Sequence, residues 1–142
     1  IVRGPDIAKG KDSDAQVISC DLFHTLLDAA GVSTRPESMT DGLSLASILK
    51  NPNKMLDRDS IYFHYPHYYH NTGPVTAMRK GDWKLLEYYE DSRVELYNLK
   101  KDMGEVTNLA STMPDLAAQL RSELHNWRAQ VGALDPEPNP DR

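Results

Sequence analysis

The chain has 142 residues and a formal net charge of −5 at pH 7, from 16 Lys and Arg against 21 Asp and Glu. This length suffices for one domain with a buried core, and 39% hydrophobic residues is typical of a soluble protein. The acidic balance lacks the basic footprint of nucleic-acid binding, and no apolar run reaches the roughly 20 residues of a membrane span. The single cysteine, Cys20, excludes an internal disulfide framework.

The N-terminal segment begins with apolar residues. Ile1 to Arg3 are expected to end a strand before the turn at Gly4-Pro5, which indicates that further sequence precedes Ile1. A polar loop follows, in which residues 12–14, Asp-Ser-Asp, are the expected helix caps. This beginning predicts that upstream sequence is missing, and a trimmed mature N-terminus is the alternative.

Two helices are expected before residue 52. The first has apolar residues from Ile18 to Ala30 over more than half of its surface, which predicts burial, and Gly31 is expected to end it. Cys20 falls inside this pattern and is expected to be a small core residue. After a loop over residues 32–40, a short helix is predicted over 43–50.

The middle of the chain has the pattern of an antiparallel meander. Short β-favouring runs separated by tight turns predict strands over 61–65, 75–79, 83–89 and 94–99. No helical segment of 10–15 residues lies between these runs, so a βαβ arrangement is excluded.

The last predicted element is a long helix over about 113–131, capped by Ser111 or Thr112. Apolar residues at 116, 120, 124, 127 and 131 form one stripe, which needs a partner surface such as the inner face of the meander. Gly132 is expected to end the helix before an extended tail over 135–142. The chain is therefore predicted to be α+β.

The densest group of functional residue types spans residues 62–70, Tyr-Phe-His-Tyr-Pro-His-Tyr-Tyr-His. Rings with hydrogen-bonding edges suit sugars and anions, which favours a ligand-facing loop; an aromatic strand packed under the last helix is the alternative. His64, His67 and His70 could share a metal ion, but Pro66 and the lack of a nearby carboxylate argue against it. Arg79, with the lysines at 80 and 84, could meet an anionic substrate.

Catalytic motifs are missing from the sequence. No Gly-x-Ser-x-Gly elbow and no phosphate-binding glycine loop occurs, and nothing assembles a nucleophile, a base and an oxyanion site. The residues alone therefore predict a module with a ligand-binding edge and no complete active site.

An ordered set of short motifs resembles the late part of the formylglycine-dependent sulfatases, the arylsulfatase family. The matching segments are residues 1–5, 17–31, 41–45, 78–85 and 95–99, then Asp102, Glu105, 108–110, Pro136 and 138–140. The family usually has proline at the position of His24. Cys20 lacks the C-x-P-S-R or C-x-A-S-R context of the family's modified cysteine.

This resemblance implies an alkaline-phosphatase-like α/β domain whose last strand and helices are residues 1–52. Residues 53–142 would then be the C-terminal subdomain, a four-stranded antiparallel sheet packed by a helix. The formylglycine nucleophile, the calcium ligands and the catalytic residues would lie upstream, and none maps onto this chain, which alone would be inactive. The upstream catalytic domain would be its partner.

The resemblance also implies a substrate class and a location. The substrate would be a sulfated carbohydrate or an aryl sulfate, and the protein would be periplasmic or secreted. His64, His67, His70 and Arg79 are the expected contributions to the rim of the substrate pocket, with no catalytic or metal residue in this chain.

Two other interpretations stay open. One is a stand-alone carbohydrate- or anion-binding module without catalysis, and the other is a structural fragment with no ligand. If the upstream domain is missing, apolar surface on the first helix should be exposed, so the isolated 142 residues are expected to aggregate or dimerise.

Overall fold

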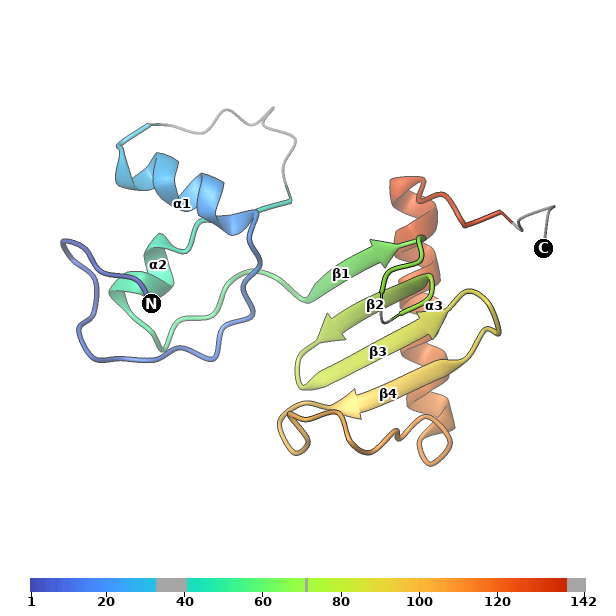
Figure 1. Cartoon of the computed structure of the whole chain (residues 1–142). Helices are drawn as coiled ribbons and strands as arrows, with labels where there is room; N and C mark the ends of the chain where they lie inside the picture. The colour runs from blue at the N-terminus through green and yellow to red at the C-terminus, as the bar shows by residue number, and fades with distance from the viewer. Residues whose placement is uncertain (33–40, 71, 138–142) are drawn as a thin grey trace. The chain divides into compact units, whose positions relative to one another are not determined.

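A computed structural model of the chain describes residues 1–32, 41–70 and 72–137, which belong to two compact units (Figure 1). The first unit comprises Ile1–Arg58 and the second Asp59–Arg142. Two short helices lie in the first unit, and four strands with one long helix lie in the second. The predicted α+β class, with a four-stranded antiparallel sheet and a C-terminal helix, is confirmed.

In the first unit, helix α1 comprises Asp21–Ala29 and helix α2 comprises Ala46–Lys50. Residues 1–20 contain no helix or strand, and no described segment pairs with the strand end expected at residues 1–3. Most of the expected loop over 32–40, and the tail beyond residue 137, lie outside the described residues.

The start of α1 differs from the prediction. The helix begins at Asp21 rather than after residues 12–14, because the Asp21 carboxylate accepts a 2.8 Å hydrogen bond from the backbone N–H of Ile18 and holds the preceding chain in a turn. Cys20 is the N-cap residue and is partly exposed, so its prediction as a core residue is wrong. Gly31 has a φ of 70°, as expected for the residue that ends a helix.

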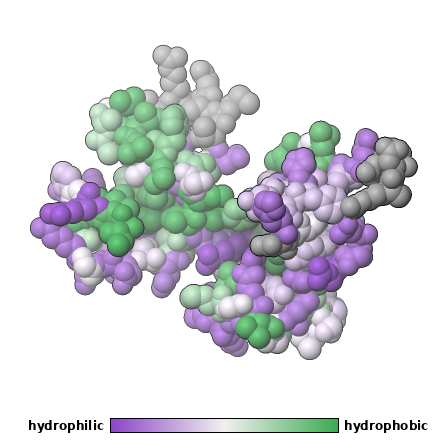
Figure 2. Space-filling model, viewed as in Figure 1, coloured by the Kyte–Doolittle hydropathy of each residue, from purple (hydrophilic) through white to green (hydrophobic). Residues whose placement is uncertain are grey.

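The described chain does not provide the burial predicted for α1, and the apolar face of the helix is exposed, as expected for these residues without an upstream domain. The side chains of Leu22, Phe23 and Leu26 are 53%, 50% and 68% exposed, and Asp21 is the one buried residue of the helix. Figure 2 shows hydrophobic residues gathered over α1. The apolar stripe exists, but no other part of the described chain covers it.

Polar contacts connect α1 to the rest of its unit. The buried Asp21 carboxylate accepts the N–H of Leu43 at 2.9 Å and forms an ion pair with the guanidinium of Arg58. The Thr25 hydroxyl donates to the Asp21 carbonyl at 2.7 Å and accepts the N–H of Leu45 at 2.9 Å. One carboxylate therefore organises three segments of the unit.

The sheet of the second unit follows chain order. Its strands are β1 (Ser60–Tyr65), β2 (Val75–Lys80), β3 (Trp83–Tyr88) and β4 (Val94–Asn98), all antiparallel to their neighbours. Each strand lies within one residue of its predicted bounds. In the register Tyr62 is opposite Met78, and Met78 is opposite Leu85, so these three residues share one face of the sheet.

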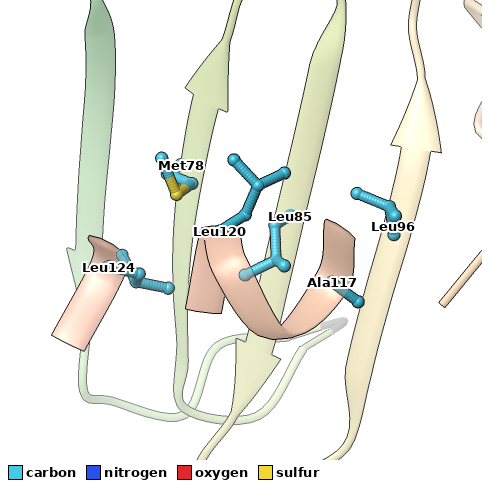
Figure 3. Packing of buried hydrophobic residues seen from close by; sticks show 6 residues of the cluster. All are labelled: Met78, Leu85, Leu96, Ala117, Leu120 and Leu124. Carbon is cyan, nitrogen blue, oxygen red and sulfur yellow. The ribbon is translucent and has the colours of Figure 1, made fainter. Parts of the chain in front are cut away.

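Helix α3 (Pro114–Val131) crosses that face (Figure 1) and closes the core. The six core residues come from three strands and from the helix (Figure 3): Met78, Leu85, Leu96, Ala117, Leu120 and Leu124. The N-cap is Met113 rather than the predicted Ser111 or Thr112, and Gly132 ends the helix with a φ of 62°.

No helix of the described residues is long and apolar enough to cross a membrane.

Candidate functional site

An aromatic cluster forms where β1 ends. The rings of Tyr65 and His67 are 5.9 Å apart, those of Tyr65 and Tyr69 are 6.2 Å apart, and those of Tyr69 and His70 are 5.0 Å apart, all edge to face. Tyr65 and Tyr69 are 39% and 63% exposed, so the cluster presents ring faces and imidazole edges to solvent. The structure thus brings His67 and His70 together through two tyrosines.

The loop that carries this cluster is fastened to the turn after β3. The Tyr68 hydroxyl donates a 2.6 Å hydrogen bond to the Glu90 carboxylate, and a backbone bridge joins Tyr69 to Thr72. A Cβ at Gly73 would lie 2.9 Å from the same carboxylate, so a larger residue there would push the Glu90 side chain aside. Sequence analysis missed Glu90 because the partner of Tyr68 is distant in the chain.

His64 lies on the other face of β1, the face that α3 covers, and is separate from His67 and His70. Its Nε2 is 2.9 Å from the carbonyl oxygen of Leu134, and its Nδ1 is 3.1 Å from the Tyr89 hydroxyl and 3.2 Å from that of Thr76. Both ring nitrogens therefore have partners inside the second unit.

These contacts fix the proton positions. Because a carbonyl oxygen only accepts, Nε2 of His64 carries the hydrogen donated to Leu134. Burial raises the pKa of Tyr89, against the opposing effects of Thr76 and Arg128, and keeps the phenol protonated. Tyr89 accepts hydrogen bonds from Thr76 at 2.7 Å and Arg128 at 3.1 Å, so its own hydrogen is available to Nδ1 of His64.

Arg79 lies on the sheet face opposite to α3, at the end of β2 remote from the aromatic cluster. It pairs with Ile61, four residues before Tyr65, and with Lys84 on β3. Its Nε is buried without a hydrogen-bond partner among the described residues, whereas Lys84 is neutralised by Glu105 at 2.6 Å. The structure therefore does not place Arg79 beside His67 and His70.

A buried carboxylate under α3 forms a second polar centre, which sequence analysis missed. Glu87 on β3 is 5% exposed, and its carboxylate lies 2.7 Å from Arg121 Nη2, 2.6 Å from His125 Nε2 and 3.5 Å from Arg128 Nη1. The signal was a glutamate at an inward-facing strand position together with arginines at positions 121 and 128 and a histidine at 125 of one helix.

No metal ligands are assigned within the described part of the chain. In residues 1–32, 41–70 and 72–137, no group of three His, Cys, Asp or Glu side chains is arranged to hold an ion.

Comparison with known proteins decides the family. The family model described as "N-sulphoglucosamine sulphohydrolase, C-terminal" matches residues 1–130. The chain belongs to this sulfatase family. A relative named "Sulfatase" from Formosa agariphila is 34% identical over 127 residues, covering 79% of this chain and 23% of the relative.

Solved sulfatase structures share the fold. BT1596, described as a 2-O GAG sulfatase, aligns with a TM-score of 0.75 and 26% identity, covering 97% of this chain and 32% of that one. BT4656, solved with its substrate D-glucosamine-2-N,6-O-disulfate, aligns with a TM-score of 0.63 and 28% identity, covering 82% of this chain and 24% of that one. The resemblance to the C-terminal part of a sulfatase is thereby confirmed.

The chain spans about a quarter of the length of the curated relatives that it matches. The activities named for these relatives are therefore those of proteins much longer than this 142-residue chain.

Proposed function

We propose that this chain is the C-terminal part of an enzyme that hydrolyses sulfate esters of a sulfated carbohydrate. The observation that supports this most is the family match over residues 1–130. The 97% coverage of this chain by a sulfatase described as acting on glycosaminoglycan supports it further. An aryl sulfate is the alternative substrate, and a periplasmic or secreted location accompanies the proposal.

In this proposal the two parts of the chain have different roles. Residues 1–52 complete the catalytic domain, and residues 53–142 form the C-terminal subdomain. The boundary between the two compact units falls a few residues later in the sequence, between Arg58 and Asp59. The exposed apolar residues of α1 are those that a partner domain would cover.

The chemistry that breaks the sulfate ester would come from upstream groups. In the family a formylglycine supplies the nucleophile and calcium stabilises the charge on the sulfate oxygens. In this proposal both tasks fall to residues upstream of this chain, so by itself it is expected to be inactive. Its own residues would bind and orient the saccharide.

His64, His67, His70 and Arg79 remain the proposed contributors to the pocket rim. His67 and His70 would donate or accept hydrogen bonds to saccharide hydroxyls and sulfate groups, while the neighbouring tyrosine rings stack against sugar faces. His64 would act by positioning, since both its nitrogens have internal partners. Arg79, which is partly exposed at the other end of the sheet, would use the outer nitrogens of its guanidinium, since its Nε is buried.

The test is sulfate release by the longer protein that carries this chain, supplied with sulfated glycosaminoglycan disaccharides and with an aryl sulfate. We expect release of inorganic sulfate from the longer protein and none from the 142 residues alone. Absence of release, together with binding of the sulfated disaccharides by the 142-residue chain, would favour the alternative of a carbohydrate- or anion-binding module.

A further inference from the structure

A groove of about 660 Å³ runs along α3 beside the edge strand β4, away from the aromatic cluster. Its apolar floor is formed by Pro114, Ala117 and Ala118 of the helix and by Val94 of β4. Small side chains at successive turns of the helix leave this space open. We call it the α3 groove.

A guanidinium and an imidazole with unused hydrogen-bonding atoms line the α3 groove. Arg121 directs Nε (2.8 Å) and Nη2 (2.7 Å) at one oxygen of Glu87, and Nη1 has no partner among the described residues. The Nε2 of His125 contacts the other oxygen at 2.6 Å, and its Nδ1 is likewise unpartnered in that part of the chain. Arg121 and His125 are 40% and 42% exposed.

The buried Glu87 carboxylate holds both groups in place. Because a carboxylate only accepts, Nε2 of His125 carries the hydrogen and Nδ1 is left as an acceptor, or becomes a donor when the ring is protonated. The guanidinium of Arg121 is planar, so fixing one edge on Glu87 orients the other edge. The groove thus presents a fixed cationic donor and an adaptable imidazole.

Polar side chains complete the lining. Ser122 and Asn126, one helical turn apart, add a hydroxyl and an amide next to Arg121 and His125. A guanidinium, an imidazole, a hydroxyl and an amide over an apolar floor match the charged groups, hydroxyls and C–H faces of an acidic saccharide.

A peptide that pairs with the edge of β4 as an added strand fits the α3 groove poorly. The outward backbone groups of β4 are already used: Leu96 N–H donates to Asn108 Oδ1 at 3.1 Å, and Leu96 C=O accepts from Leu109 N–H at 2.8 Å. Strand addition needs such groups unpaired. Side-chain recognition is therefore the mode that this surface offers.

We propose that the α3 groove binds a sulfated segment of a polysaccharide, with Arg121 Nη1 on a sulfate group and His125, Ser122 and Asn126 on neighbouring groups. The saccharide class rests on the proposed function, but the site is separate from the pocket rim. The groove would hold a distant part of the polymer while another part reaches the pocket, which raises the effective concentration of substrate.

The test uses the longer protein that carries this chain and a heparin-derived hexasaccharide, with binding measured by isothermal titration calorimetry. Arg121→Gln should weaken the groove component about tenfold, because it removes a charge-assisted hydrogen bond. Arg93→Gln is the matched control, since it removes the same charge from a side chain that stacks on Tyr88 on the other face of the sheet.

A second variant avoids any disturbance of Glu87. Ala118→Leu fills the groove from an exposed helix position where leucine is well tolerated, so the number of hexasaccharides bound per chain should fall by one. Wild-type stoichiometry and affinity in both groove variants would overturn the proposal, as would equal binding of the desulfated hexasaccharide.

Measuring aryl sulfate hydrolysis by the same proteins distinguishes a failure of the groove site from a failure of the proposed function. If the groove variants lose hexasaccharide binding and the protein hydrolyses no sulfate ester, the groove site stands and the proposed function fails. If sulfate is released normally and the groove variants bind like wild type, the proposed function stands and the groove site fails.

Discussion

The ring of Tyr62 on β1 stacks on the indole of Trp127 on α3, with centroids 4.7 Å apart and planes within 5° of parallel. This pair joins the edge of the sheet to the C-terminal half of the helix, beyond the aliphatic core. Replacing Trp127 by alanine removes the stacking and the apolar area, so we expect the free energy of unfolding to fall by about 2–3 kcal/mol.

Urea unfolding followed by circular dichroism measures this loss. Val131→Ala is the control on the same helix, because Val131 is 56% exposed and should cost less than about 0.5 kcal/mol. Equal losses in the two variants would contradict the role given to the stacked pair.

The carboxyl group of Asp21 should make the stability of the fold depend on pH. Burial would raise its pKa, but hydrogen bonds from Arg58, Ile18 and Leu43 outweigh burial and lower the pKa from 3.8 to about 2. A folded-state pKa below the unfolded value stabilises the fold above pH 4, and this contribution is lost as the pH falls from about 4 towards 2.

Melting temperatures of wild type and Asp21→Asn between pH 7 and pH 2.5 test this. We expect the variant to be clearly less stable at pH 7 and the difference to shrink below pH 4. Asp28→Asn, an exposed position on the same helix, should melt like wild type throughout. A gap between wild type and Asp21→Asn that is independent of pH would argue against the ionised form as the stabilising one.

Glu87→Gln should destabilise the second unit by about 1–2 kcal/mol, because Arg121 and Arg128 would lose their counter-charge and His125 its charged acceptor, while Arg121 and His125 keep access to solvent. Chemical denaturation of the intact chain checks the value, with the exposed Glu137→Gln as the control for loss of a carboxylate. A stability within about 0.5 kcal/mol of wild type would show that the ion cluster contributes little.

His67→Ala and His70→Ala test the proposed pocket rim. Each should raise KM for a sulfated saccharide by about three- to tenfold with little change in kcat, because each removes a binding contact and no catalytic group. Steady-state kinetics of the longer protein give the two constants separately. Lys101→Ala, a charge removed from an exposed turn, should leave both unchanged; a fall in kcat in the histidine variants would instead point to a part in the chemistry.

The apolar face of α1 predicts self-association of the isolated chain. Leu22→Ser combined with Leu26→Ser should shift sedimentation velocity profiles from oligomers towards monomer without lowering the melting temperature, because both side chains are more than half exposed. Met103→Ser, at an 87% exposed loop position, should leave the profile of the wild type unchanged. A wild-type chain that sediments as a monomer would contradict the prediction.

The sheet and α3 were predictable because their signals are local. Glycines with positive φ at residues 81 and 132 mark a turn and a helix end, and leucines at 120 and 124 follow helical spacing on the face that proves buried. Pairing with the next strand in sequence then requires no long-range information.

The structure of the first unit was less predictable because it depends on polar contacts between residues that are far apart in the sequence. Nothing near Asp21 in sequence reveals that Arg58 and Leu43 will meet its carboxylate, so the helix start was placed too early. Amphipathicity likewise showed which face of α1 is apolar, but not whether the described chain covers it. The same limit applies to the site, where the partner of Tyr68 is Glu90, 22 residues away.

The strand order of the sheet, β1-β2-β3-β4, has a consequence for how the second unit forms during synthesis. Each hairpin can close as soon as its second strand leaves the ribosome, because neighbouring strands are adjacent in the chain and contact order is low. The hydrophobic face over Met78, Leu85 and Leu96 stays uncovered until Ala117, Leu120 and Leu124 have been translated. A chain truncated before residue 114 would therefore leave this hydrophobic face exposed and be prone to aggregate. The second unit can complete its folding only after the last helix has been synthesised.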